Sequence, residues 1–152
     1  MKLAIAAFAS IGFLVSASVH IASLRGIVLG GEPLLAAYFA GAIVLFIPTV
    51  ITVNREYPGF GSKIGWSDLL ADCPAPVRIL LYGVFVYAVV NFALLLGEGA
   101  KTRHRSGEPL EASTARGLSG HAMAFYMISV AVMLSARQHE NKRGHADPHS
   151  SR

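Results

Sequence analysis

Four long stretches of this chain of 152 residues contain no Asp, Glu, Lys or Arg. These windows cover residues 3–24, 33–54, 79–97 and 117–136, which is 19 to 22 residues each. A helix of about 20 residues crosses the hydrocarbon core of a bilayer, and one charge at its centre costs about 3 kcal/mol. The windows therefore predict an all-α integral membrane protein with four spans.

The composition agrees with membrane insertion. Apolar residues make up 53% of the chain and charged residues 14%, against about 25% charged in a soluble domain. A soluble protein would have to enclose four helices that are apolar on every side, and a chain of this length is too short to cover them. We expect one transmembrane domain over residues 1–136, followed by a disordered basic tail over residues 137–152.

The connections predict an up-down-up-down four-helix bundle. Its spans are expected at about residues 3–24, 34–53, 79–96 and 117–136. The first connection is short and rich in glycine, which is typical of a tight reversal. Between the second and third spans, Ser67 can cap a short helical turn that ends near Asp72, and we expect this short helix to lie at the membrane interface.

The distribution of Lys and Arg predicts the orientation. The N-terminus, second connection and tail carry eight of these residues, and the first and third connections carry five. The excess predicts a multi-pass protein of the cell membrane with both termini in the cytoplasm. The net charge of +4 could also attract nucleic acid, but the basic residues do not form one face with interleaved aromatics. The expected contact is therefore the lipid bilayer, with no nucleic acid.

The first span has a competing interpretation. Residues 1–18 resemble a cleavable signal peptide, because an apolar run ends in the small residues Ser16-Ala17-Ser18. The apolar character resumes at Val19, however, and the whole window has the length of a full span. We therefore expect a retained span and keep cleavage as the alternative.

Two histidines inside the spans are the main candidate binding residues. His20 lies five residues before Arg25 and His121 lies five residues after Arg116, so both sit about 7.5 Å inside the same membrane face. Small residues at four-residue spacing before His20 predict close packing of the first and fourth spans, which would let the two imidazoles meet. On the third span, three polar residues share a face and are expected beside the histidines. These residues are Tyr87, Asn91 and Glu98.

Three roles for these polar residues stay open on sequence alone. They can hydrogen-bond between helices and hold the bundle together, as polar groups in spans commonly do. They can bind a metal, protons or a small molecule, because ionisable groups in spans are often functional. The two histidines can also serve as axial ligands to a b-type haem.

The remaining candidates are weaker. Cys73 is the only cysteine, so it forms no internal disulfide, and it has no histidine or lysine nearby in sequence to activate it. The tail holds His139, His145 and His149 without the spacing of a metal site. The chain contains no catalytic or nucleotide-binding motif.

These patterns predict a small accessory, assembly or binding protein of the membrane without catalysis of its own. The alternative is a redox protein that binds haem or a metal between the first and fourth spans. Other membrane subunits or a second copy of the chain are the possible partners.

Overall fold

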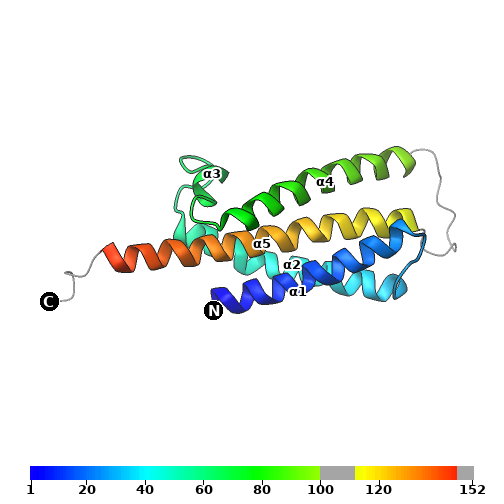
Figure 1. Cartoon of the computed structure of the whole chain (residues 1–152), viewed down its shortest axis with the longest axis horizontal. Coiled ribbons are helices and arrows are strands. Elements are labelled where there is room, and N and C mark those ends of the chain that lie inside the picture. Colours follow the sequence, from blue (N-terminus) through cyan, green and yellow to red (C-terminus); the bar gives the residue numbers. More distant parts are fainter. Residues whose placement is uncertain (100–111, 147–152) are drawn as a thin grey trace.

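The computed structural model describes residues 1–99 and 112–146, and this part of the chain is helical with no β-strand (Figure 1). Its helices are α1 (Lys2–Leu24), α2 (Gly31–Glu56), α3 (Trp66–Leu69), α4 (Ala75–Gly99) and α5 (Ala112–Ala146). The four long ones are each long and apolar enough to cross a membrane. The structure thus confirms the prediction of an all-α fold built from four packed apolar helices.

The connections form largely where the sequence places them. Gly30 and Gly31 between α1 and α2 have φ values of 68° and 59°, a left-handed conformation that favours glycine at this reversal. The short helix α3 confirms the turn predicted between the second and third spans. It begins earlier than expected, however, because the Asp68 carboxylate accepts a hydrogen bond of 2.9 Å from the Gly65 N–H and closes the first turn. Ser67 is not its cap.

Helix α5 is the centre of the bundle and packs against α1, α2 and α4 (Figure 1). Of its apolar window 67% is buried, against 22–28% for the other three long helices. Small side chains explain this position, since they let neighbouring backbones approach closely. The α5 residues with no exposed surface include Ala115, Ser119, Ala122, Ser129, Ala131, Ser135 and Ala136.

One large side chain of α5 fills a slot made by glycines. The ring of Tyr126 lies where a Cβ on Gly12 of α1 would stand only 2.2 Å from its Cε1. Its hydroxyl donates a hydrogen bond of 2.6 Å to the Tyr38 carbonyl of α2 and lies against Gly41. Tyr126 therefore joins α1, α2 and α5, and two glycines make room for it.

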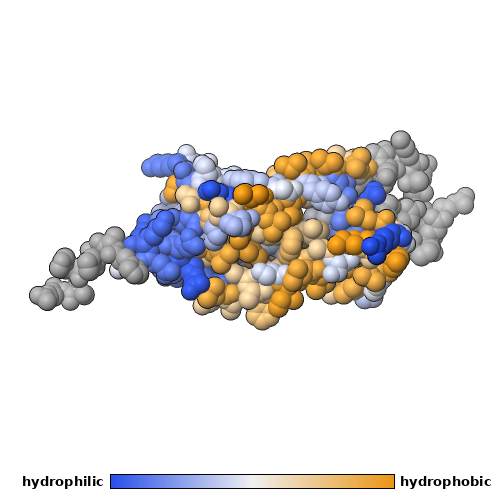
Figure 2. Space-filling model, viewed as in Figure 1, coloured by the Kyte–Doolittle hydropathy of each residue, from blue (hydrophilic) through white to orange (hydrophobic). Residues whose placement is uncertain are grey.

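Many large apolar side chains lie on the outside of the bundle, and several small polar side chains are buried inside it. Phe8 is 65% exposed and Ile79 is 71% exposed, whereas Ser16 and Ser119 are fully buried. Figure 2 shows an apolar surface along the middle of the molecule, with hydrophilic residues gathered at the end where α5 terminates. A water-soluble bundle would have the opposite distribution.

The prediction of a disordered tail from residue 137 is wrong as far as Ala146. Helix α5 continues to that residue, because polar contacts hold its last turns. His139 Nδ1 lies 2.9 Å from an Asp72 carboxylate oxygen, and Lys142 pairs with the other oxygen. The His139 ring also stacks on Tyr57 with 5.3 Å between ring centres. Residues 147–152 lie outside the described part.

Candidate functional site between α1, α4 and α5

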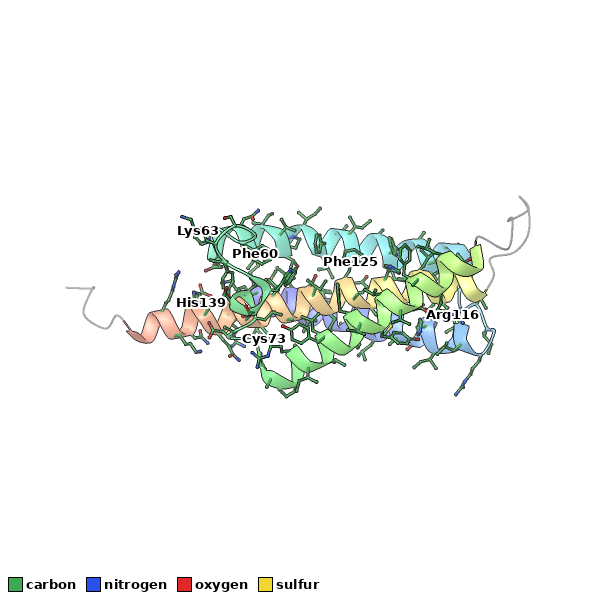
Figure 3. All side chains as sticks on the ribbon, turned by 90° about the horizontal axis from the view of Figure 1, so that it is seen from above. Phe60, Lys63, Cys73, Arg116, Phe125 and His139 are labelled. Atoms are coloured by element: carbon green, nitrogen blue, oxygen red, sulfur yellow. The ribbon has the colours of Figure 1, made fainter. Side chains whose placement is uncertain are left out.

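Polar side chains from three helices meet at the end of the bundle marked by Arg116 in Figure 3. This polar cluster consists of His20 from α1, Tyr87 and Asn91 from α4, and Ser119 with the Arg116 carbonyl from α5. Gly120 permits it, since a Cβ at that position would stand 2.7 Å from the Asn91 amide nitrogen. The helices therefore approach closely enough for side chains of α1 and α4 to reach the backbone of α5.

His20 uses both ring nitrogens within the cluster. Nδ1 lies 3.1 Å from the Arg116 carbonyl and 3.0 Å from the Ser119 hydroxyl. Nε2 lies 2.6 Å from the Tyr87 hydroxyl, and the two rings meet edge to face. A carbonyl only accepts, so the contact with Arg116 requires the proton on Nδ1. In the neutral ring Nε2 then accepts from Tyr87, which fixes the tautomer.

The other members of the cluster are satisfied in the same way. The Asn91 amide donates to the Arg116 carbonyl at 3.1 Å, and the Ser119 hydroxyl donates to the Ala115 carbonyl at 2.7 Å. His20 and Asn91 are each 4% exposed and Ser119 has no exposed surface. Buried polar groups are costly unless they are hydrogen-bonded, so these contacts hold α4 and α1 to the start of α5.

The side chain of His121 points away from the polar cluster. His121 follows Gly120, which faces the cluster, and one residue turns a helix by about 100°. Its Nδ1 donates to the Gly117 carbonyl at 2.9 Å, and its ring packs edge to face on Phe92 with 4.4 Å between ring centres. The structure therefore brings His20, Tyr87 and Asn91 together as predicted, whereas the contact expected between His20 and His121 is not formed.

The remaining predicted residues lie largely outside the part of the chain that the structure describes. Glu98 lies in the last turns of α4, and its side chain lies outside the described residues. The same holds for the side chain of His145 and for His149. Within residues 1–99 and 112–146, no group of three His, Cys, Asp or Glu side chains is placed to hold a metal ion.

A groove between α4 and α5 was not predicted from the sequence. It consists of two neighbouring cavities of about 330 and 230 Å³ that share Phe85 and Ile128. Trp66 lies at one end and His121 at the other. Both cavities have mainly apolar walls. The groove could not be predicted from the charge-free windows, because its position depends on how each helix is rotated about its axis.

The opposite end of the bundle, marked by His139 in Figure 3, carries charged pairs. Hydrogen bonds from Lys142 and then from His139 hold the pKa of Asp72 below its ordinary value. Burial raises the pKa of the nearby Cys73 thiol, so this cysteine lacks the features of an activated nucleophile. These pairs join the α3–α4 connection to α5, and they were not predicted from the sequence.

Comparison of the chain with protein-family models, curated proteins and solved structures finds no match. The fold defines it as a bundle of four helices that are each able to span a membrane. Its function is therefore argued from its own residues.

Proposed function

We propose that this chain is a small multi-pass protein of the cell membrane, with four alternating spans and both termini in the cytoplasm. In this role it serves as a non-catalytic accessory, assembly or binding protein. Its α3 helix lies at the cytoplasmic interface, and α5 extends from the membrane into the cytoplasm beyond Ala136.

The inverted distribution of side chains is the observation that supports this proposal best. Val86 at the middle of α4 is 62% exposed and Leu14 of α1 is 63% exposed, while several serine side chains are fully buried. Lipid solvates such apolar faces, and small polar residues pack the helices together. Helix α1 continues through Ser16, which is fully buried, so its whole length contributes to the bundle and supports a retained first span.

Reporter fusions and membrane extraction test this proposal. A reporter placed after Pro58 or after Arg152 should be active in the cytoplasm, and one placed after Arg105 should be active on the opposite side. The chain should stay in the membrane pellet after extraction at alkaline pH, as integral proteins do. A chain released by that treatment, or a periplasmic reporter after Arg152, would contradict the proposal.

A binding or assembly role is supported by the groove between α4 and α5. Both helices leave apolar walls open to the surroundings there, with Phe85 50% and Phe125 37% exposed. A transmembrane helix of another subunit or of a second copy is the occupant that fits such a surface in the bilayer. Cysteines placed at Val89 or Phe125 in a Cys73→Ser background should crosslink to that partner in membranes, and failure at both positions would reject the groove.

The alternative role in haem or metal binding is not favoured by the side-chain arrangement. Iron ligation would require His20 Nε2 to exchange its bond with Tyr87 for a metal, and would require His121 to leave Phe92 and Gly117. We therefore assign the cluster to holding the helices together. Protein purified from haem-replete cells should be colourless, and a low-spin haem spectrum lost on His20→Ala would overturn this assignment.

A further inference from the structure

A charged cavity lies where α1 begins, α2 ends and α5 leaves the bundle. It has a volume of about 360 Å³ and is lined by side chains from all three helices. Its lining includes Lys2, Leu3, Arg55, Glu56, Arg137 and Glu140. This cavity is at the opposite end from the polar cluster, and it plays no part in the proposed contacts of the groove.

The cations of this cavity differ in their pairing. Lys2 Nζ lies 3.0 Å from Glu56 and 3.2 Å from Glu140, so its charge is used within the bundle. Arg55 and Arg137 have neither a hydrogen-bond nor an ion-pair partner among the described residues. Lys2 with its two carboxylate partners carries a net charge of −1, and the guanidinium groups of Arg55 and Arg137 add +2, so these five side chains of the lining sum to +1.

The position of these arginines matches that of a lipid headgroup. Arg55 and Arg137 are the first charged residues that follow the apolar windows of α2 and α5. The exposed side chain of Leu3 lies beside them and continues into the apolar surface of α1. A molecule bound here would therefore meet cations at one end and hydrocarbon at the other, as a phospholipid does.

We propose that this cavity binds the phosphate of an anionic phospholipid, with Arg55 and Arg137 as its ligands. Guanidinium groups donate parallel hydrogen bonds to phosphate oxygens, and anionic lipids are concentrated on the cytoplasmic side of membranes. The inference rests on the proposed membrane location and orientation. It deepens that proposal by naming a lipid class that the protein selects.

Binding of fluorescent phosphatidylglycerol to the full chain in neutral detergent micelles tests this site. Each cation near the headgroup contributes about 1 kcal/mol, so the double variant Arg55→Gln/Arg137→Gln should bind about 30-fold more weakly than the natural chain. Both side chains are exposed, so the helical content by circular dichroism should not change.

The double variant Lys63→Gln/Arg143→Gln is the matched control. It removes the same charge from the same end of the bundle but leaves the cavity lining intact. Its affinity for phosphatidylglycerol should stay within about 3-fold of the natural value, because charges outside the site act only through a screened field. Equal losses in both double variants would show general attraction and overturn the site.

Two further probes distinguish the source of the phosphate. Phosphatidylcholine should compete weakly, because its headgroup carries no net charge. Inorganic phosphate should also compete weakly, because it lacks the acyl chains that contact the apolar surface. Full competition by inorganic phosphate would overturn the lipid assignment. A chain that is soluble without detergent would instead contradict the membrane proposal before any lipid is added.

Discussion

Replacement of Gly12 by alanine should loosen the junction between α1 and α5. The added Cβ would stand 2.2 Å from Cε1 of Tyr126, whereas ordinary contacts begin at 3.4 Å. Either the Tyr126 ring or the backbone of α1 at position 12 must therefore move by 3.4 − 2.2 = 1.2 Å. The tyrosine cannot retreat toward α2, because Gly41 and the hydrogen bond to Tyr38 hold its hydroxyl there. Overpacking of this kind costs about 1–3 kcal/mol of unfolding free energy.

Gly83→Ala is the control, since a Cβ at that position of α4 meets no atom within 4 Å. Alanine is the better helix former, so this variant should be neutral or more stable by up to about 1 kcal/mol. Unfolding free energies would be measured by denaturant titration in mixed micelles, with circular dichroism as the signal. The double variant Gly12→Ala/Tyr126→Leu should be less destabilised than the sum of its single changes, because leucine removes the ring atoms that clash.

Equal stability of the Gly12→Ala and Gly83→Ala variants would refute this reasoning. It would show that Tyr126 does not occupy a slot against α1. An additive result in the double variant would lead to the same conclusion, since the two sites would then not be in contact.

Three further predictions concern Tyr87, Asp72 and Cys73. Tyr87→Phe should lower the unfolding free energy by about 1 kcal/mol in the same titration, because the buried His20 Nε2 loses its donor; an unchanged value would contradict that bond. The lowered pKa of Asp72 means that its contribution to stability is complete above the ordinary carboxyl pKa and is lost as the pH falls through the folded value. Asp72→Asn should therefore flatten the acid part of the stability profile, and an identical profile would count against its pairing with Lys142. The Cys73 thiol has a raised pKa and is buried, so maleimide should label it more slowly than a short peptide thiol at neutral pH; equal rates would place it at the surface.

The long helices could be predicted from the sequence because a charged side chain at the centre of a membrane span has a high free-energy cost. Residues such as Arg25 and Arg78 had to lie outside the spans, and the structure places them at or near helix ends. The central position of α5 was harder to predict, because it is the least hydrophobic of the four long helices. Its small side chains decide that position, and they act through close packing rather than through hydropathy.

The positions of the candidate site residues along their helices could be predicted from the sequence, but the directions of their side chains could not. Counting residues from Arg25 and Arg116 predicted the same depth for His20 and His121, and in the structure His20 contacts Ser119, two residues before His121. The rotation of α5 depends on how Gly120 packs against Asn91, so the direction of His121 could not be read from spacing. The partners of Asp72 were missed for a related reason, because the basic residues after Ala136 show no apolar pattern that would indicate a helix.

A spin label at Val86 tests the central claim most directly. This residue lies in the middle of α4 with its side chain 62% exposed, so a membrane-inserted bundle would present it to lipid. In the reconstituted Val86→Cys/Cys73→Ser chain, collisions of the label with oxygen should be frequent and collisions with a water-soluble nickel chelate should be rare. Frequent collisions with the nickel chelate would show that the exposed apolar face meets water, and would contradict the membrane assignment.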